Sequence, residues 1–189
     1  MIVNLPNALT WLRILAVPLV VVLFYMPETW ADPAAGLLFA GAAVTDSLDG
    51  YLARRLGLTS RLGAFLDPVA DKLIVAVALV LLVSKDTQLV VVLTAAVVIG
   101  REIAISALRE WMAEIGQRTR VAVSWIGKLK TIAQMVGLSM MLYRVDLFGL
   151  PIYQLGLALT VLAAVLTLWS MVVYLRAAWP VLAESAEGK

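Results

Sequence analysis

Long apolar stretches alternate with short polar ones along the chain, and this pattern predicts membrane-spanning helices. A helix that crosses the hydrocarbon core of a bilayer needs about 20 mostly apolar residues. Six stretches come close to that requirement, at residues 9–26, 34–54, 67–84, 88–109, 126–143 and 152–175. The segments between them are short and carry Pro, Gly or charge, so successive helices are expected to be antiparallel neighbours. We predict an all-α, polytopic membrane protein with six transmembrane helices in a single domain, residues 1–189.

Composition narrows the chemistry that this fold can perform. Hydrophobic residues make up 62% of the chain and charged residues 15%, which is outside the usual balance of a soluble domain. Cysteine and histidine are both absent, so thiolate nucleophiles, imidazole bases and Cys or His metal sites are excluded. The net charge of +2, without a run of basic residues, argues against a nucleic-acid partner. Catalysis would have to rest on carboxylates, hydroxyls, Lys and Arg.

The basic residues predict how the chain is oriented. Lys85 and Arg144 are the only Lys or Arg at one set of helix ends, and the others fall at or near the opposite ends. Positively charged loops stay on the cytoplasmic side of a membrane. Both termini are therefore predicted to be cytoplasmic. The charged residues inside the spans also belong to the cytoplasmic halves, which predicts a polar cavity open to the cytosol and closed by apolar helix on the outer side.

Four aspartates stand out in the second and third predicted spans: Asp46, Asp49, Asp67 and Asp71. Asp46 and Asp49 are three residues apart, and Asp67 and Asp71 are four apart, so each pair shares one helix face. An antiparallel pair of helices would bring all four to the same depth. Asp67 could instead cap the helix N-terminus, with Pro68 at the first helical position.

Carboxylates packed together repel one another and are costly to desolvate, so they need cations or protons near a membrane. An all-oxygen site suits Mg²⁺, Mn²⁺ or Ca²⁺ and argues against Zn²⁺ or copper. Two ions about 3.5–4 Å apart would form the clamp used in many phosphoryl transfers. Gly50 and Ala53 leave room for a ligand beside the helix, and Arg54 could reach a phosphate oxygen.

The string Asp46-x2-Asp49-Gly50-x2-Ala53-Arg54-x8-Gly63-x3-Asp67-x3-Asp71 resembles the signature of the CDP-alcohol phosphatidyltransferases at every defining position. The resemblance implies the six-helix, usually dimeric membrane fold of that family. It also implies a metal-dependent attack of an alcohol on the β-phosphorus of a CDP-linked lipid, with release of CMP.

The same resemblance implies roles for individual residues. The four aspartates would bind two divalent ions, Mg²⁺ or Mn²⁺, and Asp71 would be the general base. The CDP pocket would be formed by Asp49, Gly50, Ala53, Arg54, Gly63, Asn7 and Thr10.

Three further segments, 4–13, 100–113 and 123–131, resemble one bacterial branch of the family. That branch, the phosphatidylglycerophosphate synthases, couples CDP-diacylglycerol to sn-glycerol 3-phosphate. The likeness implies an enzyme of phospholipid biosynthesis in the bacterial cytoplasmic (inner) membrane, with membrane lipids around it and a second copy of the chain as partner.

Basic residues near the cytoplasmic ends of the fourth and fifth spans favour an acceptor that carries phosphate. The predicted acceptor phosphate site consists of Arg101, Arg109, Arg118, Lys128 and Lys130. Alternatively, these residues only enforce topology or bind anionic lipid headgroups. For Arg118 and Arg120 the two interpretations weigh about equally.

Other functions compete with this one. A sibling transferase would use the same donor with inositol phosphate, serine or phosphatidylglycerol as the acceptor. A divalent-cation transporter could use the same carboxylates, but it would need polar groups that continue toward the outer face, and spans three, five and six carry almost none there. An inactive scaffold gives no reason for four carboxylates at these spacings.

Overall fold

The structure, a computed structural model, describes residues 5–56, 61–115 and 125–186. Within these ranges the side chains of residues 5–7, 47–56, 61–62, 64, 125–128, 177–178 and 180–186 are not described. The elements are the helices α1 (Leu5–Tyr25), α2 (Ala31–Leu56), α3 (Arg61–Lys85), α4 (Leu89–Glu114), α5 (Trp125–Tyr143) and α6 (Ile152–Ala186). Each overlaps one of the predicted stretches for most of its length, which confirms the all-α expectation.

Length and composition support fewer spans than the six predicted. Among the described residues, three segments are long and apolar enough to cross a membrane: Ala8–Tyr25, Leu89–Glu114 and Ile152–Arg176. These apolar helices indicate a membrane protein. The other three helices, α2, α3 and α5, include several of the charged residues discussed above, which lowers their mean hydropathy. Their role as spans is not established by composition.

Three helix ends lie five or more residues from the sequence-based expectation, and one of these is the end of α4, at Glu114 instead of residue 109. α3 begins at Arg61, so Pro68 lies inside the helix and Asp67 is not an N-cap. That alternative is wrong because the residues before Asp67 are already helical. At the eighth position of α3, Pro68 has no N–H to donate to the Ala64 carbonyl oxygen, and its ring crowds that carbonyl. α6 continues past Arg176 to Ala186. At about 1.5 Å per residue, its 35 residues extend well beyond a hydrocarbon core of about 30 Å.

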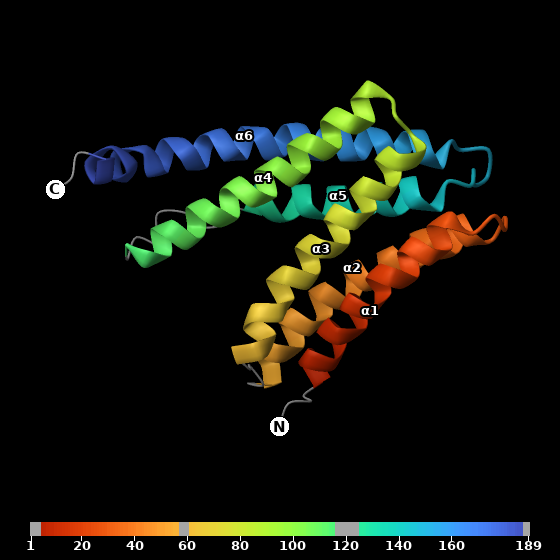
Figure 1. Ribbon diagram of the computed structural model, residues 1–189, viewed down its shortest axis with the longest axis horizontal. Helices are drawn as coiled ribbons and strands as arrows, with labels where there is room; N and C mark the ends of the chain where they lie inside the picture. The colour runs from red at the N-terminus through yellow and green to blue at the C-terminus, as the bar shows by residue number, and fades with distance from the viewer. Residues whose placement is uncertain (1–4, 57–60, 116–124, 187–189) are drawn as a thin grey trace.

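The helices form two groups that diverge from one end of the molecule. Figure 1 shows the turns at 26–30, 86–88 and 144–151 toward one end, while the far ends of α1, α2 and α3 point away from the far ends of α4, α5 and α6. α1 packs against both α2 and α3, which touch each other little. α5 packs on α2 and α6, and α4 packs on α6 and α3.

Within the described part of the chain, α4 and α5 do not form a packed pair. The expectation that all successive helices are antiparallel neighbours is therefore wrong for this pair. The physical reason is that α6 lies against both helices and takes the place of a direct contact between them.

An apolar core closes the end where the turns lie. Its fully buried members include Phe24, Phe39, Leu82, Val98 and Leu142, contributed by five helices. α5 and α6 cross closely, because a Cβ added at Gly156 would lie 2.7 Å from the Gly137 carbonyl oxygen. Small residues allow this approach, as in other membrane helix pairs. This half of the molecule is therefore tightly packed.

Polar contacts join the turns at the same end. The Tyr153 hydroxyl donates to Asp86 at 2.5 Å, and the Lys85 ammonium lies 3.6 Å from the Asp32 carboxylate. The Arg144 guanidinium lies 5.6 Å from the centre of the Tyr153 ring. The hydrogen bond from Tyr153 is the main reason that the pKa of Asp86 is lowered. These contacts tie the three turns together, while the opposite helix ends remain apart.

Candidate active site

A cavity of about 530 Å³ lies where the two helix groups diverge. Residues from α2, α3, α4, α5 and α6 line it. Three of the four predicted aspartates border it, namely Asp46 from α2 and Asp67 and Asp71 from α3. The predicted cations Arg101, Arg109 and Lys130 border the same space. The structure thus brings together residues that are up to 84 positions apart in the sequence, from 46 to 130.

Two side chains of α1 contact the carboxylates. The Arg13 guanidinium pairs with Asp46 at 2.6 Å, and the Thr10 hydroxyl donates to Asp67 at 2.5 Å. Thr10 and Arg13 are each only 1% exposed, and their spacing of three residues puts them on one face of α1. α1 therefore links the acidic residues of α2 to those of α3. The helices α2 and α3 themselves make little direct contact. The sequence predicts that Arg13, like the other charged residues inside the spans, lies in the cytoplasmic half of the protein. It does not predict which residue Arg13 contacts.

Several predicted residues lie outside the described side chains. Asp49, Gly50, Ala53 and Arg54 fall on α2, and Asn7 falls on α1, with only their backbone described. Gly63 is buried in the first turn of α3. Among the described side chains, no three acidic groups come close enough together to surround one metal ion. The fourth aspartate, Asp49, is not among those side chains, and the set of four aspartate ligands stays a prediction.

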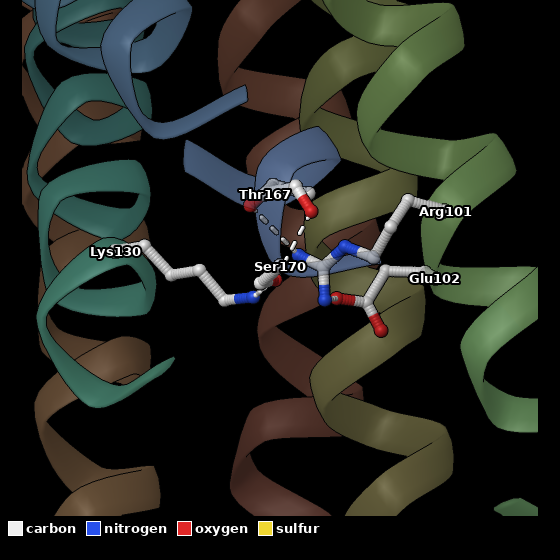
Figure 2. Close-up of polar contacts among 5 residues, drawn as sticks. All are labelled: Arg101, Glu102, Lys130, Thr167 and Ser170. Atoms are coloured by element: carbon white, nitrogen blue, oxygen red, sulfur yellow. Dashed lines mark hydrogen bonds and ion pairs between the residues drawn. The ribbon is translucent and has the colours of Figure 1, made fainter. Parts of the chain in front are cut away.

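The basic side of the cavity is built on α4 and α5 and contacts α6. Figure 2 shows Arg101 and Lys130 approaching α6 from opposite sides. Lys130 donates to the Ser170 hydroxyl, and Arg101 Nη2 donates to Thr167 Oγ1 at 3.4 Å. Arg101 Nη1 also pairs with Glu102 at 2.8 Å. Three predicted acceptor-site cations are therefore held around one space.

Arg109 is the third of these cations. Its guanidinium lies 5.8 Å from the centre of the Tyr174 ring. Of the other predicted acceptor residues, Lys128 has no described side chain, and Arg118 lies outside the described residues, as does Arg120. Lys72 of α3 and the acidic residues Glu102 and Glu110 of α4 also line the cavity.

The contribution of α6 was missed by sequence reasoning. Thr167, Ser170 and Tyr174 are three and four residues apart, so they share one face of a largely apolar helix. That spacing is the signal that could have found them. A hydroxyl within an apolar span is ambiguous from sequence, because it often bonds to its own helix backbone.

A second, mostly apolar groove of about 420 Å³ adjoins the cavity between α3 and α4. The two spaces share Lys72, Glu102, Ser106 and Glu110, and beyond these the groove is lined by aliphatic side chains. A ligand with a charged head and an apolar tail could occupy both. The cavity has carboxylates of α2 and α3 on one side and cations on the other, and the apolar groove opens beside it. This arrangement suits a reaction between a lipid diphosphate and an anionic acceptor.

Comparison with known proteins agrees with this geometry. A family model described as CDP-alcohol phosphatidyltransferase matches residues 3–179. Proteins named CDP-diacylglycerol–glycerol-3-phosphate 3-phosphatidyltransferase from Shigella flexneri serotype 5b, Shigella boydii serotype 4 and Escherichia coli K12 are each 55% identical over 175 residues. The matched region covers 93% of this chain and 94% of each relative.

Proposed function

The chain belongs to the CDP-alcohol phosphatidyltransferase family, and we propose that it transfers the phosphatidyl group of CDP-diacylglycerol to sn-glycerol 3-phosphate. The products would be phosphatidylglycerophosphate and CMP. The observation that carries the proposal is a single cavity with carboxylates of α2 and α3 on one side and Arg101, Arg109 and Lys130 on the other. The names of relatives that match nearly the whole chain support the same donor and acceptor.

The donor would bind on the acidic side of the cavity. Asp46, Asp67 and Asp71 offer only oxygen ligands, the donor set that Mg²⁺ and Mn²⁺ prefer, and with Asp49 they would hold two such ions. Bound divalent metal would polarise the diphosphate and neutralise charge on the departing CMP. The CDP group would lie against Asn7, Thr10, Asp49, Gly50, Ala53, Arg54 and Gly63.

Thr10 has a second effect within this proposal. Its hydroxyl bonds to Asp67, so it would orient that carboxylate while bordering the nucleotide.

The acceptor would bind on the basic side. Arg101, Arg109 and Lys130 would bind its phosphate, with Arg118 and Lys128 completing the site. The 1-hydroxyl of glycerol 3-phosphate would then attack the β-phosphorus of the donor. Asp71 would accept the hydroxyl proton, and the bond from the β-phosphorus to the CMP oxygen would break. A carboxylate beside metal is a weak base, so positioning and charge stabilisation would supply much of the rate.

The surroundings follow from the same proposal. The chain would be a single catalytic domain, residues 1–189, in the bacterial cytoplasmic membrane, among membrane lipids. It would cross the membrane several times as a homodimer, with both termini and the cavity on the cytoplasmic side. The acyl chains of the donor would lie along the apolar groove between α3 and α4.

The proposal is tested by CMP release from purified full-length protein. With CDP-diacylglycerol, sn-glycerol 3-phosphate and Mg²⁺ or Mn²⁺, we expect steady release of CMP that stops when EDTA is added and resumes with excess metal. Omission of the acceptor should also stop it. CMP release that requires another alcohol would support a transferase of this family but reject sn-glycerol 3-phosphate as its acceptor. The absence of CMP release with every acceptor would reject the transferase activity itself.

A further inference from the structure

The distance between the two halves of the basic site is set by α6. Arg101 comes from α4 and Lys130 from α5, and these helices do not pack together in the described part of the chain. Both pack on α6, and Figure 2 shows its hydroxyls between the two cations. For Arg101 and Lys130 to bind one ligand together, α6 must therefore hold α4 and α5 at the right separation. α6 itself contributes no cation to the described cavity lining.

In its contact with Lys130, the Ser170 hydroxyl acts only as a hydrogen-bond acceptor. Its own proton is donated to the Thr167 carbonyl oxygen at 3.0 Å, which leaves the oxygen lone pairs to accept from the Lys130 ammonium. An ammonium has further N–H groups that remain available for a ligand. Lys130 is only 6% exposed, so the one contact that fixes its direction strongly limits where those groups can point.

Arg101 is held in a similar way. Its Nη2 group donates to Thr167, its Nη1 group pairs with Glu102, and its Nε group is buried with no hydrogen-bond partner among the described residues. Tyr174, one turn beyond Ser170, lies under the Arg109 guanidinium. Each cation of the site thus contacts a different residue of one α6 face.

We propose that Thr167, Ser170 and Tyr174 are positioning residues that direct Arg101, Lys130 and Arg109 toward the phosphate of the acceptor. This inference rests on the proposed function, and it names the residues that would give the site its affinity for the acceptor. Uncharged hydroxyl and ring groups can orient a cation without neutralising it, whereas a carboxylate at the same place would offset the charge that attracts the ligand. Of the acidic residues that α4 contributes to the cavity lining, Glu102 pairs with Arg101, and Glu110 borders the same space.

The contacts predict a graded effect on acceptor binding. Ser170→Ala removes a charge-assisted hydrogen bond to a buried ammonium, and we expect the KM for sn-glycerol 3-phosphate to rise about tenfold. Thr167→Val removes a long contact of 3.4 Å, and we expect a rise of about threefold. The KM for CDP-diacylglycerol should change less than about twofold in both, and Ser170→Thr, which keeps the hydroxyl, should restore acceptor binding.

Thr160→Val provides a matched control on the same helix. Thr160 is fully buried, and its hydroxyl donates to the Gly156 carbonyl oxygen at 2.8 Å, away from the three cations. It should show the wild-type KM for both substrates. Thermal midpoints of all variants in detergent would reveal any general loss of folding.

The inference is overturned if Ser170→Ala matches Thr160→Val in the KM for sn-glycerol 3-phosphate, or if it raises the KM of both substrates equally. Either result with an active wild-type protein leaves the proposed function standing. A wild-type protein that releases no CMP with sn-glycerol 3-phosphate overturns both.

Discussion

At the scale of single residues, the carboxylates are distinguished by their neighbours. Asp46 pairs with Arg13 and Asp67 accepts a hydrogen bond from Thr10, whereas the cavity-lining Asp71 lies one helical turn beyond Asp67. Two of the three are thus oriented by side chains of α1, which would hold them in place for the proposed metal binding. Asp71 is better suited to exchange a proton with a substrate.

Replacement of Asp71 by asparagine tests that role. Asp71→Asn keeps the size of the side chain and removes its ability to take a proton, so we expect kcat to fall by at least about 100-fold. Binding of CDP-diacylglycerol should remain measurable. Asp146→Asn, the same change at an exposed residue in the turn between α5 and α6, should have wild-type kcat. Near-normal turnover of Asp71→Asn with Mg²⁺ present would show that the base lies elsewhere.

How far the sequence predicts the site depends on the kind of contact. Helical spacing and the family signature predicted Asp46, Asp67 and Asp71 as site residues. The clustering of cations predicted Arg101, Arg109 and Lys130. All six residues border the cavity. The partners Arg13, Ser170 and Tyr174 were not assigned. These contacts join helices distant in sequence, and a hydrophobic pattern gives the period of a helix and not its neighbours.

At the scale of helices, the apolar stretches determined where each element lies, because long apolar runs persist until a charge or turn interrupts them. They did not determine which helices touch. The crossing of α5 and α6 depends on small residues at Gly137 and Gly156, and the position of α6 between α4 and α5 depends on side-chain fit. Neither is encoded in mean hydropathy.

The close crossing of α5 and α6 gives a prediction about stability. In Gly156→Ala the added Cβ would lie 2.7 Å from the Gly137 carbonyl oxygen and 2.8 Å from Met140 Cβ, so the helices must separate. We expect a loss of about 1–3 kcal/mol, seen as a lower thermal midpoint in detergent. Gly41→Ala on α2 meets no atom within 4 Å and should be neutral or slightly stabilising. Equal midpoints for the two variants would contradict the packing described.

At the scale of the whole molecule, the two ends of the helix groups differ in character. One end is closed by aromatic and aliphatic packing and tied by contacts between turns, and the other diverges around the charged cavity. In a membrane, this asymmetry would give the water-soluble acceptor access from one side only. The distribution of Lys and Arg predicts that this side faces the cytoplasm.

The absence of cysteine allows a clean test of this orientation. Phe148 is 96% exposed in the turn between α5 and α6, and Glu114 is exposed at the opposite end, where α4 finishes. A membrane-impermeant maleimide added outside intact inner-membrane spheroplasts should label Phe148→Cys and leave Glu114→Cys unlabelled until the membrane is opened. Labelling in the reverse order would invert the topology and place the cavity outside the cell.

Whether the cavity joins CDP-diacylglycerol to sn-glycerol 3-phosphate is tested most directly by a competition among acceptors in a single reaction. Purified protein, CDP-diacylglycerol and Mg²⁺ are mixed with equal concentrations of sn-glycerol 3-phosphate, inositol phosphate, serine and phosphatidylglycerol, and the lipid products are identified by mass spectrometry. We expect phosphatidylglycerophosphate to be the dominant new lipid, with CMP formed in an amount equal to the total new lipid. A dominant product with any of the other headgroups, or the absence of any new lipid, would contradict this expectation.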